Sequence, residues 1–134
     1  MFSFFTTNEA NAALPDVIKK FENALAKRNE ISKLEKEMQM SLSTTNSFEE
    51  YVNLKQTLNL AMTKFYESVE ILENTGVVVK SIEQGLLDFP SKRFDEEVWL
   101  CWKHGETEIK FWHEKDSGFM GRKPIDTVDL RDLV

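Results

Sequence analysis

The sequence predicts an α+β protein in which a long antiparallel α-helical hairpin is followed by a small antiparallel β-sheet. Up to about residue 75, apolar residues recur every three or four positions, which is the period of one helix face. After Gly76 the pattern changes to short β-branched and aromatic runs, which are typical of strands. The 134 residues fit a single domain, with the hairpin at about 6–75, the β module at about 77–125 and a C-terminal tail at 126–134.

Composition excludes several classes of function. The net charge is −6, and both halves hold more acidic than basic side chains, so we expect no basic surface for nucleic acid. One cysteine cannot form an intrachain disulfide, and no apolar run approaches the about 20 residues of a membrane span. The first residues lack the charged and apolar regions of a signal peptide. We therefore expect a soluble cytoplasmic protein that binds neither nucleic acid nor membrane.

The first helix begins at a capping box, because Thr6 is followed three residues later by Glu9. Pro15 either ends this helix or kinks it, and the sequence leaves both outcomes open. From Asp16 an apolar stripe with helical spacing continues to Leu42, with charged side chains on the opposite face. This charged face is expected to be solvated.

A second capping box, Ser47 with Glu50, starts the next helix, and Gly76 is suited to end it. Two helices of about 26 residues, each about 39 Å long, would form a hairpin of coiled-coil type. Three further apolar residues lie off the main stripe: Leu60, Tyr66 and Ile71. We expect this surplus apolar surface to pair with a second copy, giving a homodimer through the helices. The alternative is that the sheet of the same chain covers it.

Strands are expected at 77–82, 98–103 and 108–114, with a brief extended segment that ends at Pro90. The last two strands flank Gly105 and should form a hairpin. With a two-residue turn at Gly105 and Glu106, Cys101 and His113 lie on opposite faces, and we favour this register because it segregates charged from apolar groups. A three-residue loop would shift one strand by one position and place five residues on one face: Trp99, Cys101, Ile109, Phe111 and His113.

A series of short motifs runs along the chain. FTTNEANAALP lies near the N-terminus, and GLLDFP, LCW, GE, WH and GRKP follow in the second half. In this order they resemble the family called domain of unknown function 2203, over nearly the whole chain. The matching positions in the second half are Asp88, Phe89, Pro90, Cys101, Trp102, Gly105, Glu106, Trp112, His113, Asp116, Gly118, Gly121, Arg122 and Pro124. The resemblance implies a small cytoplasmic prokaryotic protein and carries no established activity.

Asp88, His113 and Asp116 are the candidate metal ligands. His113 and Asp116 are three residues apart in an expected loop, and with Asp88 they form a histidine and two-carboxylate set suited to Mn, Fe or Zn. A divalent metal is therefore the cofactor that these residues suggest. His113 and Asp88 are also the candidate catalytic acid/base residues, because histidine titrates near neutral pH. We favour the structural interpretation over the metal site: the two aspartates cap turns or pair with His113 and Arg122 to fix loop geometry.

The segment from Gly118 to Arg122, together with Trp112, is the candidate ligand-binding region. Gly118 and Gly121 let backbone N–H groups converge on an anion, and Arg122 binds a carboxylate or phosphate through two hydrogen bonds. A structural turn held by an Arg–Asp pair is the other interpretation, and the two glycines alone favour it over an anion site. Cys101 would need a neighbouring base to lower its pKa before it could act as a nucleophile, and a cysteine in the middle of a strand is expected to be a small buried apolar residue.

Two functions are compatible with these residues. The favoured one is a non-catalytic binding or interaction module that holds a small acidic ligand or a protein partner near Asp88, His113 and Arg122. The alternative is a small metal-dependent or acid/base enzyme that uses the same three residues and Asp116. No nucleotide-binding or nucleophile motif is present.

Overall fold

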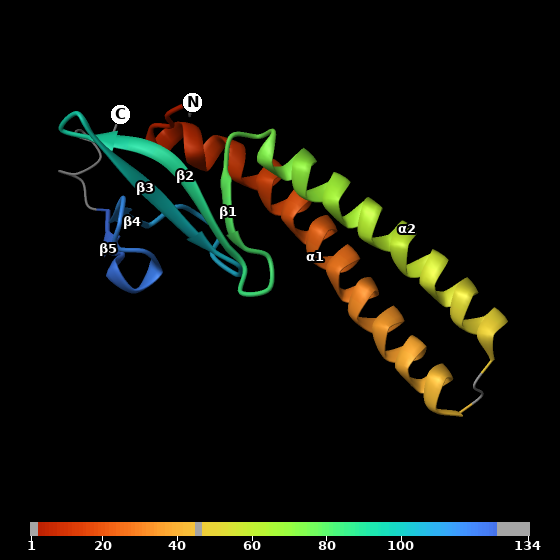
Figure 1. The fold of residues 1–134 in the computed structure, drawn as a ribbon. Coiled ribbons are helices and arrows are strands. Elements are labelled where there is room, and N and C mark those ends of the chain that lie inside the picture. The colour runs from red at the N-terminus through yellow and green to blue at the C-terminus, as the bar shows by residue number, and fades with distance from the viewer. Residues whose placement is uncertain (1–2, 45–46, 126–134) are drawn as a thin grey trace.

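A computed structural model describes residues 3–44 and 47–125 and places two helices before a five-stranded antiparallel sheet (Figure 1). The helices are α1 (Thr7–Thr44) and α2 (Phe48–Glu73). The strands are β1 (Val78–Ser81), β2 (Leu86–Arg93), β3 (Glu96–Lys103), β4 (Phe111–Glu114) and β5 (Lys123–Pro124), with a 3-10 helix, η1 (Phe119–Gly121), before β5. The predicted α+β class is confirmed, and the expected tail 126–134 lies outside the described residues.

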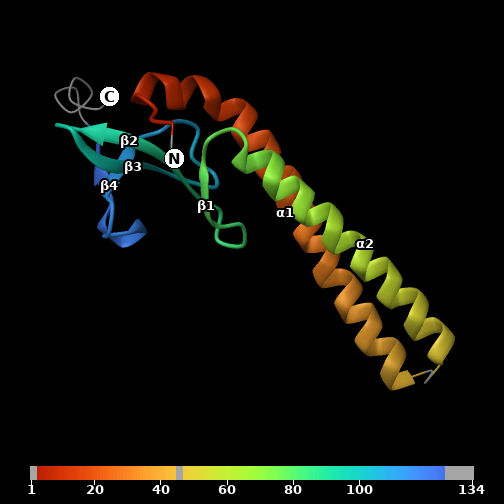
Figure 2. The same ribbon diagram turned by 45° about the horizontal axis from the view of Figure 1, so that its top comes forward.

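Helix α1 begins at the predicted capping box. The Thr6 backbone N–H donates to Glu9 Oε1 at 2.9 Å, and the Glu9 N–H donates to Thr6 Oγ1 at 3.0 Å. The helix continues through Pro15 and is 38 residues long, so Pro15 does not end it. Figure 2 shows that the first turns of α1 bend away from the rest, as expected where a proline removes one helical hydrogen bond.

Helix α2 begins and ends at residues with suitable cap chemistry. Ser47 Oγ accepts a hydrogen bond from the Glu50 N–H at 3.2 Å. Gly76 adopts a φ of +103°, and a side chain there would meet the Phe5 ring at 3.0 Å. Neither described helix combines the length and apolar character that a membrane span requires. The two helices form a hairpin that projects well beyond the sheet (Figures 1 and 2).

The sheet has the strand order β1-β2-β3-β4-β5, and each neighbouring pair is antiparallel. The segment around Pro90 is not a brief extended piece, as expected, but part of the eight-residue strand β2. The Pro90 carbonyl accepts a hydrogen bond from the Phe5 N–H at 2.7 Å, so this edge of Pro90 faces the N-terminal segment. The N–H and C=O of a strand residue point to the same edge, so the missing N–H of Pro90 faces the N-terminal segment and weakens no bond to β3.

The favoured register of the β3–β4 hairpin is wrong. Trp99 pairs with His113 and Cys101 with Phe111, so these four residues share one face, as in the alternative register. The physical reason is a longer connection of residues 104–110, which no two-residue turn describes. Trp102 Nε1 donates to the Glu106 carbonyl at 2.8 Å within this connection.

Ile109 lies in this connection, although both of the registers considered from the sequence placed it in a strand. Its backbone N–H donates to Asn11 Oδ1 of α1 at 2.7 Å, and its side chain is buried in the core. A contact with α1 therefore fixes where β4 begins, and no pattern within the hairpin itself contains that information.

The hydrophobic core lies between α1 and one face of the sheet. Phe21 of α1 packs edge-on against Trp102 with ring centroids 5.3 Å apart, and Leu87, Phe89 and Leu100 belong to the same cluster. Because side chains alternate along a strand, the residues between them face the other side of the sheet. That side carries the η1 segment, which lies opposite the start of α1 in Figure 2. The candidate site is on this second face.

Candidate metal centre

Three adjacent strands each supply one side chain to a buried cluster on the face away from α1. Asp88 of β2 pairs directly with Cys101 of β3, and His113 of β4 pairs with Trp99, two residues along β3. The exposed fractions are 3% for Asp88 and 2% each for Cys101 and His113. One carboxylate oxygen, one sulfur and one ring nitrogen from these residues lie within 4.8 Å of one another. Sheet pairing holds the cluster in place.

The protonation of the His113 ring follows from its two partners. Nδ1 lies 2.8 Å from the Glu114 carbonyl oxygen, which can only accept, so Nδ1 carries a proton. Nε2 lies 3.1 Å from both Oδ1 and Oδ2 of Asp88. These distances exceed the about 2.7–2.9 Å of a charge-assisted hydrogen bond. With a second proton, Nε2 donates a longer hydrogen bond that the two carboxylate oxygens share, and without it the lone pair of Nε2 would face the carboxylate.

Burial and hydrogen bonding act in opposite directions on the pKa of His113. Desolvation lowers this pKa and is the largest effect, and the charge of Lys80 lowers it further. The hydrogen bond to Asp88, the Glu114 carbonyl and the Asp88 charge together outweigh them, so the pKa is raised above 6.5. Without a metal, the ring is therefore biased toward its doubly protonated, ion-paired form.

Cys101 is a protonated thiol when no metal is bound. Burial, followed by the charge of Asp88, raises its pKa to about 11, and nearby Arg122 opposes this shift in part. A thiol with such a pKa is a poor nucleophile. The expectation that Cys101 is not a catalytic nucleophile agrees with this environment.

The cluster opens on a pocket of about 310 Å³. Besides the three cluster residues, its lining consists of Lys80, Leu86, Lys115, Asp116, Gly118 and Phe119. Lys80 lies over the Trp99 ring at 4.6 Å from the centroid, and Lys115 pairs with Glu97 at 3.4 Å. A small molecule in this pocket would therefore reach both the buried cluster and two cationic side chains.

The predicted site residues divide into two groups. Asp88, His113, Asp116 and Gly118 line the same pocket. Asp116 contributes no donor atom to the described three-residue cluster, and Cys101 is its third member. The sequence analysis did not predict Cys101 as a metal ligand, because the favoured register placed Cys101 and His113 on opposite faces. The alternative register placed both residues on one face and would have predicted that they are neighbours.

Arg122, Gly121 and Trp112 do not line this pocket, although the Arg122 guanidinium lies within hydrogen-bond reach of the Cys101 thiol. The Arg122 guanidinium stacks on the rings of Phe111 and Phe119, at 3.9 and 4.4 Å. Its Nη1 lies 2.9 Å from Glu106 Oε2, an ion pair without hydrogen-bond alignment. Trp112 belongs to the core, and a side chain at Gly121 would meet Ser117 at 2.8 Å. These contacts give the three residues packing roles in the described structure.

Thiolate, imidazole and carboxylate form a donor set suited to zinc and neighbouring divalent ions. Three protein ligands leave one tetrahedral position for water or a ligand, as in catalytic rather than structural zinc sites. The bond from His113 Nδ1 to the Glu114 carbonyl is of the kind that orients metal-binding histidines, and it directs Nε2 toward Asp88, where an ion would bind. The cluster thus has the chemistry of an open transition-metal centre.

Comparisons with known proteins place the chain in one family. The family model described as "Uncharacterized conserved protein (DUF2203)" matches residues 3–125. No curated protein and no solved structure matches the chain. The matched range includes the whole cluster and its pocket. The chain therefore belongs to the DUF2203 family of uncharacterized conserved proteins.

Proposed function

We propose that this protein binds one divalent transition-metal ion, of the zinc class, through Asp88, Cys101 and His113. The observation that supports this proposal most directly is the convergence of three different donor types from three strands within 4.8 Å. All three side chains are buried, and buried polar groups of this kind are retained where they pair or coordinate an ion.

The donor spacing is close to what such an ion requires. Zinc bonds of about 2.0–2.1 Å to nitrogen and oxygen, at a tetrahedral angle, put the two donors about 3.3 Å apart. Nε2 of His113 lies 3.1 Å from each carboxylate oxygen of Asp88, so a shift of a few tenths of an ångström suffices. A buried Asp–His ion pair would account for two of the three residues, whereas a bound ion accounts for all three donors together.

The pocket further supports binding of a small acidic ligand beside the ion. Lys80 lines it, and in the described part of the chain no carboxylate lies within ion-pair distance of the Lys80 ammonium. Its charge acts on His113, which places it beside the cluster. Lys80 and a bound cation would together attract a carboxylate or phosphate group. Because Arg122 is engaged with Glu106, Lys80 takes the part that the sequence suggested for Arg122.

A metal-dependent enzyme is the second candidate function, because the fourth coordination position faces a pocket rather than protein. His113 would not act as an acid or base in it, since both of its ring nitrogens have partners. Asp116, Lys80 and Lys115 are the titratable groups of the pocket lining, outside the cluster, that could transfer a proton. A ligand that binds without turnover identifies the binding function, and turnover abolished by Asp116→Asn identifies the enzyme.

Cobalt substitution tests the proposed centre, because a thiolate bound to Co²⁺ gives a charge-transfer band in the near ultraviolet. We expect this band at one equivalent of Co²⁺ in the wild-type protein and in Asp116→Asn, whose carboxylate is outside the cluster. Cys101→Ser should lose the band, and Asp88→Asn, which removes a direct ligand, should weaken cobalt binding by at least the about 10- to 100-fold typical of losing an outer partner of a ligand. A band that persists in Cys101→Ser, or no saturable binding by the folded wild type, would refute the proposal.

A further inference from the structure

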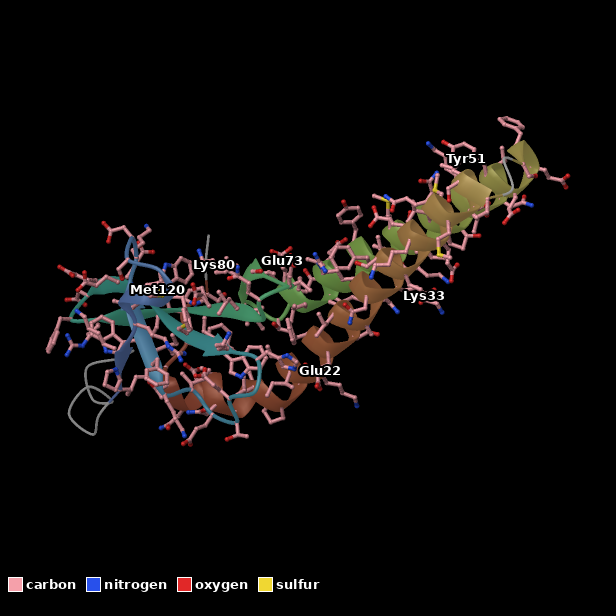
Figure 3. The ribbon with its side chains drawn as sticks, turned by 90° about the horizontal axis from the view of Figure 1, so that it is seen from below. Glu22, Lys33, Tyr51, Glu73, Lys80 and Met120 are labelled. Atoms are coloured by element: carbon pink, nitrogen blue, oxygen red, sulfur yellow. The ribbon has the colours of Figure 1, made fainter. Side chains whose placement is uncertain are left out.

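We infer that one face of the α1–α2 hairpin is an interface between two copies of this chain, which pair as a four-helix bundle. The inference is independent of the metal centre, because the hairpin projects away from the sheet that carries it (Figure 1). Figure 3 shows Lys33 and Tyr51 far along the hairpin, whereas Lys80 lies at the sheet.

The hairpin has little hydrophobic core beyond the end of the sheet. Six of the eight buried residues of α1 lie between Thr7 and Ala24, and only Leu34 and Ser41 follow. In α2 the buried residues are Ser68 and Leu72, which lie near its end at the sheet. Most helical stability in proteins comes from packing of an apolar face, and two long helices with so few buried residues lack that packing within one chain.

Two exposed apolar side chains of α2 share one side of the hairpin, while others, such as Tyr66, are exposed elsewhere on it. Leu60 is 56% exposed and Ile71 is 51% exposed. They are eleven residues apart in α2, which is about three helical turns, so both point to the same side. Patches of this kind on a helical surface mark contacts with another protein.

The same face of the hairpin contains a groove, and Leu60 lies at its edge. A groove of about 360 Å³ runs between the helices, and Ala26, Leu34, Leu60 and Ala61 provide its apolar lining. The two alanines leave room that larger side chains would fill. In a two-fold pair, Leu60 of each copy inserts into the groove of the other, which is the self-complementary arrangement that a symmetric dimer needs.

Charges at the rim of the groove are also self-complementary. Lys27, Glu30 and Lys64 line it, and none of them forms an ion pair within residues 3–44 and 47–125. When the α1 helices of two copies lie antiparallel, Glu30 of each copy reaches Lys27 of the other. A rim with both signs favours a second copy over a purely acidic or purely basic partner. The antiparallel arrangement also places the two sheets at opposite ends, where they do not collide.

Sedimentation velocity with EDTA present tests this interface without the metal centre. We expect a species of twice the 15.6 kDa chain mass at tens of micromolar. Leu60→Glu should give a monomer with unchanged helical circular dichroism, since Leu60 is exposed in the single chain. Tyr66→Glu is the matched control: Tyr66 is 62% exposed but lies six residues from Leu60, on another side of α2, and the dimer should persist.

Charge reversal then identifies the paired residues. Glu30→Lys and Lys27→Glu should each weaken the dimer about tenfold. In either variant, residues 27 and 30 carry the same charge, so both symmetric contacts of the dimer become contacts between like charges. An equimolar mixture of the two variants should recover the dimer as a mixed species. A monomeric wild type at about 100 µM, a dimer that survives Leu60→Glu, or no recovery in the mixture would overturn the inference.

Discussion

Nε2 of His113 lies equally far, at 3.1 Å, from the two carboxylate oxygens of Asp88. A single N–H bond favours one acceptor at a shorter distance, whereas an ion held between imidazole and carboxylate needs space. The Cys101 thiol borders this space, and the pocket opens onto it. Two residues that are 25 positions apart in the chain thus define the centre of the candidate site.

In the metal-free protein, His113 should make the free energy of unfolding fall as the pH rises through neutrality. Its folded pKa is raised above 6.5, so the folded state holds the proton more tightly than the unfolded state. The stabilisation is complete below about pH 6.5 and is lost as the pH rises through the raised folded value. Urea unfolding in EDTA, compared with His113→Gln, should show the wild type losing this advantage. A pH-independent difference between the two proteins would contradict it.

Cys101 should react slowly with thiol reagents in the native protein. Its pKa of about 11 leaves only about one thiolate in ten thousand at pH 7, and the side chain is buried. Modification by a chromogenic disulfide should therefore be far slower in buffer than in denaturant, and slower again after zinc is added. Equal rates in the native and unfolded protein would show that the thiol is neither buried nor protonated.

Gly85→Ala should destabilise the protein more than Gly105→Ala. Both glycines have positive φ angles, +71° and +105°, so both substitutions introduce backbone strain. A Cβ at Gly85 would also lie 2.4 Å from His104 Cβ, whereas a Cβ at Gly105 meets nothing within 4 Å. We expect an additional loss of about 1–3 kcal/mol at Gly85 from this overlap. Equal losses in urea unfolding would show that the connection relaxes around the clash.

Arg122→Met should lower stability without removing the metal. The guanidinium stacks on Phe111 and Phe119 and pairs with Glu106, and its side chain is largely buried. Loss of the charge leaves Glu106 without this partner, at a cost of about 1–2 kcal/mol. Thermal unfolding measures this loss, and cobalt should still bind at one equivalent, but less tightly, because the Cys101 thiol loses a cation that lowers its pKa. Abolished cobalt binding in a folded Arg122→Met variant would contradict the packing role.

Local signals in the sequence predicted the elements well. Thr6 with Glu9, and Ser47 before Glu50, start helices where their cap chemistry requires. Helical spacing predicted the hairpin, and the motif series pointed to the family. These features depend on residues within one or two turns of one another, so the sequence alone contains them.

The arrangement of the site depended on a contact that local patterns do not record. The register of β4 is set where the Ile109 N–H meets Asn11 of α1, 98 positions away. The criterion of segregating charged from apolar groups favoured a register that places Cys101 on the wrong face, because this criterion takes no account of the contact with Asn11. Residue type alone suggested that Asp88 and His113 could converge, and their side chains lie 3.1 Å apart, whereas the position of Cys101 follows only from the register.

Zinc content of matched histidine variants tests the central proposal most directly. The chain has two histidines, and His104 is partly exposed beside Glu22, outside the cluster. After metal removal, reloading and dialysis, elemental analysis should give about one zinc per chain for the wild type and for His104→Gln. His113→Gln should retain far less than one equivalent while remaining folded. Equal zinc in both variants, or none in the wild type, would contradict a metal centre at Asp88, Cys101 and His113.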